Sequence, residues 1–193
     1  TYNTNPNKEK MFKGVFDGAN HKIDNLKVSI DASSPAQTTA GLFGSVYAST
    51  IKNLVIGEHC EFVSTTANEG LIGSIAGFSM NSTIENCKSY ATLSYDGGTL
   101  VKRQSIGGIV GSFNCSSADG MENSDKSLLK NCVFYGTMTA KNAADNNNGG
   151  TGISLGGIVG FARANTVISN CKVLGGVPTD CYDNGALVGD GND

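Results

Sequence analysis

The chain has 193 residues, of which 26 are Gly, none is Trp and only 16% are charged, and its formal net charge is −3. This composition argues against a helical protein, and a slightly acidic chain without clustered Lys or Arg offers no basic surface for nucleic acid. No apolar run approaches the ~18 residues of a membrane-spanning helix, so no membrane span is predicted.

Two short signatures alternate along the chain. The first is Ile or Leu, any residue, Asn and then Leu or Cys, and it begins at Ile23, Ile51, Ile84, Leu129 and Ile168. The second is a box of small residues that ends in Gly, and it begins at Ala40, Gly73, Gly107, Gly156 and Gly185. Repeats of this size are typical of solenoids, in which each unit buries its apolar face against its neighbours. We therefore predict a single all-β solenoid domain over residues 1–193.

The Asn of the first signature marks a corner between two short strands. Asn tolerates the left-handed backbone conformation, and a bend there lets the preceding Ile and the following Leu or Cys face the same interior. Stacked coils then form an Asn ladder whose amides hydrogen-bond to the next rung. Its members are Asn25, Asn53, Asn86, Asn131 and Asn170.

Three sets of side chains are expected to fill the interior. Alternate strand residues share one face; this pairs Leu26 with Val28, Leu54 with Ile56, Cys87 with Ser89, Cys132 with Phe134, and Cys171 with Val173. Seven residues after each Asn comes a second apolar column: Ala32, Cys60, Leu93, Met138 and Val177. The boxes supply the third set: Leu42, Ile75, Ile109, Ile158 and Leu187.

The run FKGVFDGANHKIDNL from Phe12 to Leu26, followed by AGLFG and TIKNLVI, resembles the GLUG repeat of bacterial surface proteins. The resemblance covers roughly residues 12 to 189. It implies a right-handed parallel β-helix, here with about five coils, in an extracellular, cell-surface setting such as an adhesin or the neighbour of an IgA-cleaving metallopeptidase domain. The family supplies no catalytic residues. The chain is also expected to be a fragment of a longer surface protein.

The six cysteines do not suggest a metal site. The repeat places Cys60, Cys87, Cys132 and Cys171 in interior columns as buried thiols, while Cys115 and Cys181 lie outside the columns and are left as an open candidate pair. His21 and His59 are far apart in the sequence and near no catalytic signature. We predict no metal, cofactor or catalytic residue.

Two polar insertions and one tyrosine pair remain as candidate ligand-binding residues. The insertions at 118–126 and 141–150 contain Asp119, Glu122, Asp125 and Asp145, whose spacing does not match an EF-hand loop. Loops inserted in solenoids are either solvated connections or a binding face. Tyr90 and Tyr135 each follow their Asn by four residues and should stack, as core if they face inward, which the pattern favours, or as an aromatic surface if they face outward.

The sequence favours a non-enzymatic adhesion or ligand-binding module whose partner is a host or bacterial surface glycan or protein. Two alternatives stay open. A β-helix polysaccharide lyase or glycosidase would need paired carboxylates or a basic residue with a bound cation, and Asp17, Lys22 and Asp24 are the nearest approach to such a set. A structural stalk that presents another domain is the third reading.

Overall fold

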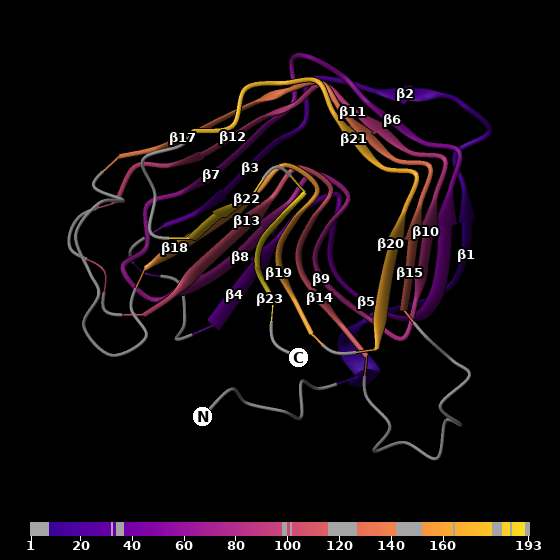
Figure 1. Cartoon of the computed structure of the whole chain (residues 1–193), viewed down its shortest axis with the longest axis horizontal. Coiled ribbons are helices and arrows are strands. Elements are labelled where there is room, and N and C mark those ends of the chain that lie inside the picture. The colour runs from indigo at the N-terminus through magenta and orange to yellow at the C-terminus, as the bar shows by residue number, and fades with distance from the viewer. Residues whose placement is uncertain are drawn as a thin grey trace.

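The computed structural model describes residues 8–31, 33, 37–97, 100, 102–115, 127–141, 152–163, 165–178, 183–185 and 187–191. Regular structure in these residues is strand, apart from one turn of 3-10 helix, η1 (Lys8–Lys10). The strands pair in parallel and stack into sheets that wrap around a common interior (Figure 1). The fold is therefore all-β and consistent with the predicted parallel β-solenoid. No helix in the described part of the chain is long and apolar enough to cross a membrane.

Sheet A contains nine strands among the described residues, and its centre is the long strand β5 (Phe43–Lys52). The first half of β5 pairs with β9, and the second half pairs with β1 and β10. In later coils this long segment is replaced by two separate strands. The other strands of sheet A are β1 (Phe12–Asp17), β9 (Ala76–Met80), β10 (Thr83–Glu85), β14 (Val110–Asn114), β15 (Ser127–Lys130), β19 (Val159–Ala162), β20 (Thr166–Ser169) and β23 (Val188–Gly191).

Three smaller sheets complete the wall. Sheet B consists of β2 (Lys22–Ile23), β6 (Val55–Ile56), β11 (Lys88–Ser89), β16 (Val133–Phe134) and β21 (Lys172–Val173). Sheet C consists of β3 (Lys27–Ile30), β7 (Glu61–Ser64), β12 (Thr92–Tyr95) and β17 (Thr137–Ala140). Sheet D consists of β4 (Gln37–Ala40), β8 (Glu69–Gly73), β13 (Gln104–Gly107), β18 (Ile153–Gly156) and β22 (Asp183–Gly185).

Each coil visits the sheets in the same order: D, the two parts of A, then B and C. Strands β8 to β12 show one such passage in sequence order. The glycine box lies at the corner between sheets D and A, where Gly73, Gly107 and Gly156 are in register. A Cβ atom at Gly107 would overlap the carbonyl oxygen of Val110. The box is therefore needed because the backbone folds closely upon itself at this corner.

The Asn corner between sheets A and B confirms the predicted ladder. Asn53, Asn86, Asn131 and Asn170 have φ values of 53°, 54°, 54° and 51°, in the left-handed region. The Nδ2 atom of Asn86 donates to Oδ1 of Asn53 at 3.3 Å, and Nδ2 of Asn131 donates to Oδ1 of Asn86 at 3.1 Å. Asn thus adopts the left-handed conformation of the bend, and the side chains of Asn53, Asn86 and Asn131 also hydrogen-bond from one coil to the next.

The predicted place of Asn25 in this ladder is wrong. Ile23 pairs with Ile56 rather than with Ile51, whose partner in the first coil is Phe16. The turn after β1 occupies the corner instead, and Asp17 Oδ1 accepts the 3.0 Å hydrogen bond from Asn53 Nδ2. Asn25 has a φ of 59°, but it lies at the next corner, between β2 and β3. In the first coil the turn between β1 and β2 is longer, so the Ile-x-Asn signature lies at the next corner of the coil.

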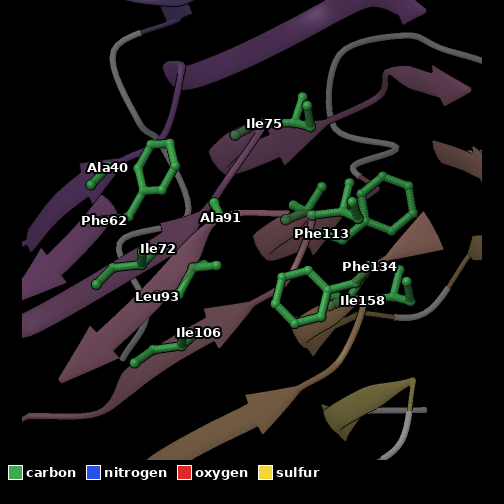
Figure 2. Packing of buried hydrophobic residues seen from close by; sticks show 14 of the residues in the cluster. Ala40, Phe62, Ile72, Ile75, Ala91, Leu93, Ile106, Phe113, Phe134 and Ile158 are labelled. Carbon is green, nitrogen blue, oxygen red and sulfur yellow. The ribbon is translucent and has the colours of Figure 1, made fainter. Parts of the chain in front are cut away.

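The interior holds the apolar columns that the sequence predicted. Ile51, Leu54, Cys87, Cys132 and Phe134 are all at most 1% exposed. Ile75, Ile109 and Ile158 from the boxes are fully buried, whereas Leu42 is partly buried. Figure 2 shows Ile72 near Ile106, and Phe113, Phe134 and Ile158 gathered together. Leu187 lies beside Ile158 in the register of the boxes, as predicted, but it is 41% exposed next to the last described strand, where Val188 packs against the core.

Cys60 is buried as expected, but in a different column. Glu61 pairs with Thr92, so Cys60 lies beside Ala91, and Phe62 is the residue that stacks with Leu93 and Met138. The chain between Asn53 and this strand is two residues longer than in the next coil, because Gly57, Glu58 and His59 form a turn there. Ala32 of the same predicted column lies outside the described residues.

A second apolar cluster lies on the outside of the wall. Ile72 belongs to the interior, so its strand neighbour Leu71 points outward, where it packs with Met11, Phe78 and Met80. Tyr47 packs against this cluster, and the ammonium groups of Lys8 and Lys13 lie 5.1 Å and 5.6 Å from its ring centroid. The segment before β1 therefore covers the outer face of β8 and β9.

Candidate functional site

Tyr90 and Tyr135 form a stacked pair on the outer face, directly after the sheet B strands β11 and β16. Their ring centroids are 4.6 Å apart and their planes differ by 5°. The rings are 38% and 37% exposed, while the preceding Ser89 and Phe134 are buried. The predicted stacking is confirmed, and the interior placement that the pattern favoured is wrong, because alternation along each strand sends the residue after Phe134 outward.

The orientation of the pair decides what it can offer a ligand. The centroid distance is close to the spacing of about 4.8 Å between parallel strands, so the ring faces point along the stack of coils. One face of each ring is covered by the other ring, and both residues are more than one-third exposed. Neither hydroxyl hydrogen-bonds to a described residue. The pair is therefore a source of two phenol donors beside an aromatic edge, rather than a flat stacking surface.

The tyrosines belong to one of two parallel columns on the outer face of sheet B. Backbone hydrogen bonds from Gly57, Tyr90, Tyr135 and Leu174 each reach the preceding coil and place these residues in one column that begins at Asp24. Two residues earlier on each strand lies the second column, with the register Lys22, Val55, Lys88, Val133 and Lys172. In Figure 1 the strands β2, β6, β11 and β21 lie at the outer rim of the wall.

One end of these columns carries a compact cluster of charges. Lys22 Nζ lies 3.1 Å from Asp24 Oδ2 and 3.5 Å from Glu58 Oε2, and His59 Nδ1 lies 3.1 Å from Asp24 Oδ2. The hydrogen bond from the His59 ring, followed by that from Lys22, lowers the pKa of Asp24 far below its ordinary value. The pKa of Glu58 is also lowered, by its own backbone N–H and by Lys22. Both carboxylates are thus held ionised.

This cluster is not suited to acid catalysis or to a metal. Of the predicted set, Lys22 and Asp24 lie together, whereas Asp17 bonds to Asn53 and pairs with Lys52 at 3.5 Å. A glycosidase needs one carboxyl group whose pKa is raised, and both pKa values here are lowered. Ligand atoms of Asp24, Glu58 and His59 lie within 4.8 Å of one another, but the Lys22 ammonium group lies 3.1 Å from Asp24 and 3.5 Å from Glu58 and would repel a cation, so we assign no metal to them.

The remaining predicted site residues cannot be placed. Asp119, Glu122, Asp125 and Asp145 lie outside the described residues. Cys181 also lies outside the described residues, and Cys115 forms no disulfide, so the Cys115–Cys181 pair that the sequence left open does not form in this structure. The described thiols of Cys60, Cys87, Cys132 and Cys171 are free of disulfides, as expected for interior columns.

Comparison of the chain with protein-family models, with curated proteins and with solved structures gives no match. The function is therefore inferred from the residues of the chain itself. The sequence reasoning did not find the lysine column or the contact of Glu58 and His59 with Lys22. The column was visible in the segments KSY, VFY and KVL, each of which begins two residues after a ladder Asn. The contact of Glu58 and His59 with the Lys22 cluster could be found only from the strand register of the first coil.

Proposed function

We propose that this protein is a non-enzymatic ligand-binding module of a bacterial surface protein, and that it binds a glycan of a host or bacterial surface through the tyrosine pair. The observation that carries this proposal is the exposed, stacked Tyr90–Tyr135 pair with two unused hydroxyl groups. Tyrosine is favoured at binding surfaces because it combines apolar area with a polar tip at a small entropic cost.

The resemblance to the GLUG repeat supports the extracellular, cell-surface and adhesive part of the proposal. In that setting the chain is a right-handed solenoid of about five coils and part of a longer protein. A solenoid suits such a role because its rigid wall presents side chains at fixed spacing over several coils. The lowered pKa values of Asp24 and Glu58 favour binding over glycoside hydrolysis.

The test is a glycan array probed with the unmodified protein and with the Tyr90→Ser, Tyr135→Ser double variant. We expect specific binding by the unmodified protein and at least a tenfold loss in the variant. The matched control is Val15→Ser, which removes another exposed apolar side chain, 70% exposed on β1. This control should bind normally. Urea unfolding of both variants verifies that the fold is intact.

A reducing-end assay on the glycans that bind separates this function from catalysis. We expect no release of reducing ends. Turnover that is abolished by Asp24→Asn would show a glycosidase or lyase and would contradict the proposal. An array without any specific binding would also contradict it and would favour a structural stalk.

A further inference from the structure

The lysine column beside the tyrosines repeats with a period of two coils. Lys22, Lys88 and Lys172 alternate with Val55 and Val133 on the outer face of sheet B. With about 4.8 Å between strands, successive lysines in this column are about 10 Å apart. This is about the length of one extended disaccharide. The column therefore presents positive charges at the repeat of a linear polymer.

Two of the three lysines are available for a ligand. Lys22 is held by Asp24 and Glu58. Lys88 and Lys172 are exposed, and neither forms an ion pair within the described part of the chain. Val133, which lies between them, is partly buried and places no charge there. Two ammonium groups without an ion-pair partner among the described residues thus lie on one strand face, separated by the apolar Val133.

The tyrosine pair lies beside this lysine pair. Tyr90 follows Lys88 by two residues on the same face, and Tyr135 is next to Val133 in the same way. Phenol hydroxyl groups donate hydrogen bonds to carboxylate or sulfate oxygens, and such charge-assisted bonds are stronger than neutral ones. The anionic end of the columns, at Asp24 and Glu58, repels a negative ligand. The binding region for an anion therefore extends from Lys88 to Lys172.

We propose that the ligand of the tyrosine pair is an acidic polysaccharide that carries one carboxylate or sulfate group on alternate sugars and lies along the stack of coils. This inference rests on the proposed function and names its ligand. Lys88 and Lys172 each bind one acidic group of successive disaccharides, and the hydroxyls of Tyr90 and Tyr135 donate hydrogen bonds to oxygens of these groups and of the sugar between them.

The experiment measures the affinity of three oligosaccharides of equal length by calorimetry at low salt. Hyaluronate carries one carboxylate per disaccharide, κ-carrageenan carries one sulfate per disaccharide, and desulfated κ-carrageenan is the neutral control. We expect at least one acidic oligosaccharide to bind tenfold or more tightly than the neutral one, with an affinity that falls as salt is added. Which of the two binds identifies the acidic group.

Two double variants with the same change of charge test the lysine pair. Lys88→Gln with Lys172→Gln should lose at least tenfold in affinity for the acidic ligand and most of the salt dependence. Lys10→Gln with Lys102→Gln removes two exposed lysines from other faces, neither of which forms an ion pair within the described residues. This pair should bind as the unmodified protein does. Thermal unfolding verifies that both variants fold.

The outcomes distinguish the inference from the function on which it rests. Equal losses in the two double variants would overturn the inference, because any two lysines would then serve. Tyrosine-dependent binding of the neutral oligosaccharide that equals the acidic ones would also overturn it, while leaving the proposed function in place. Binding of none of the three, together with an empty glycan array, would overturn both.

Discussion

Asn131 donates a 3.1 Å side-chain hydrogen bond to Asn86, its counterpart at the same corner of the neighbouring coil. Asn86 in turn donates to Asn53. Asn53, Asn86 and Asn131 therefore each do two things at once: they adopt the left-handed backbone that turns the chain, and their side chains tie successive coils together.

Asn86→Ala should lower the free energy of unfolding by about 1–3 kcal/mol, because it removes two side-chain hydrogen bonds and places a Cβ-bearing residue without a polar group in the left-handed region. Urea denaturation measures the change. Asn170→Ala is the matched control, since Asn170 has a similar φ of 51° and no side-chain hydrogen bond to a described residue. It should cost about 1 kcal/mol. Equal losses would mean that the ladder bonds contribute nothing.

Ser79→Ala should leave stability unchanged or raise it by up to about 1 kcal/mol, because the buried Ser79 hydroxyl has no hydrogen-bond partner. The matched change is Ser64→Ala, where the buried hydroxyl donates to Gln104 Oε1 at 3.2 Å. Its loss leaves the Gln104 oxygen without that donor and should cost about 1–3 kcal/mol. Chemical denaturation measures the free energy of unfolding of both variants. A greater loss of stability in Ser79→Ala than in Ser64→Ala would contradict the prediction.

Cys171 should react with iodoacetamide in the folded protein, whereas Cys87 and Cys132 should react only after unfolding. Cys171 is partly exposed, and a hydrogen bond from the Cys132 thiol is the main cause that lowers the pKa of Cys171 to about 7. Because the thiolate is the reactive form, the labelling rate should rise steeply as pH increases through about 7. Mass spectrometry of a Cys115→Ser, Cys181→Ser background locates the label, and Cys171→Ser should abolish it. If Cys132 were labelled before Cys171 in the folded protein, the expected difference in their accessibility would be wrong.

Asp24 should contribute to stability above its ordinary pKa of 3.8 and lose that contribution in acid. The pKa in the folded protein is lower than in the unfolded chain, so the unfolded chain takes up the proton first as pH falls, and stability decreases below pH 3.8. Asp24→Asn removes this titration. The difference in unfolding free energy between the two proteins should be largest near neutral pH and shrink in acid. A difference that does not change with pH would contradict the assignment.

The sequence by itself determined the class of fold and most of the core. The alternation of Ile-x-Asn with the glycine box was sufficient, because a solenoid repeats one local conformation and the same residue types recur wherever the backbone turns or closes upon itself. Asn53, Asn86 and Asn131 and the buried thiols of Cys87 and Cys132 were all assigned correctly for this reason.

Only the tertiary structure decided register and the outward face. Asn25 carries the signature and the left-handed backbone, yet it lies at another corner, because the turn after Asp17 lengthens the first coil. Local residue preferences predict that a corner forms at an Asn, but they do not predict how many residues separate one corner from the next. The outward position of Tyr90 and Tyr135, and the column of Lys88 and Lys172 beside them, depend on which residues of successive coils pair. Pairing between residues far apart in the chain is set by stacking of the whole wall, so the segments KSY, VFY and KVL showed the residues of the site, and only the stacked coils showed which of them lie side by side.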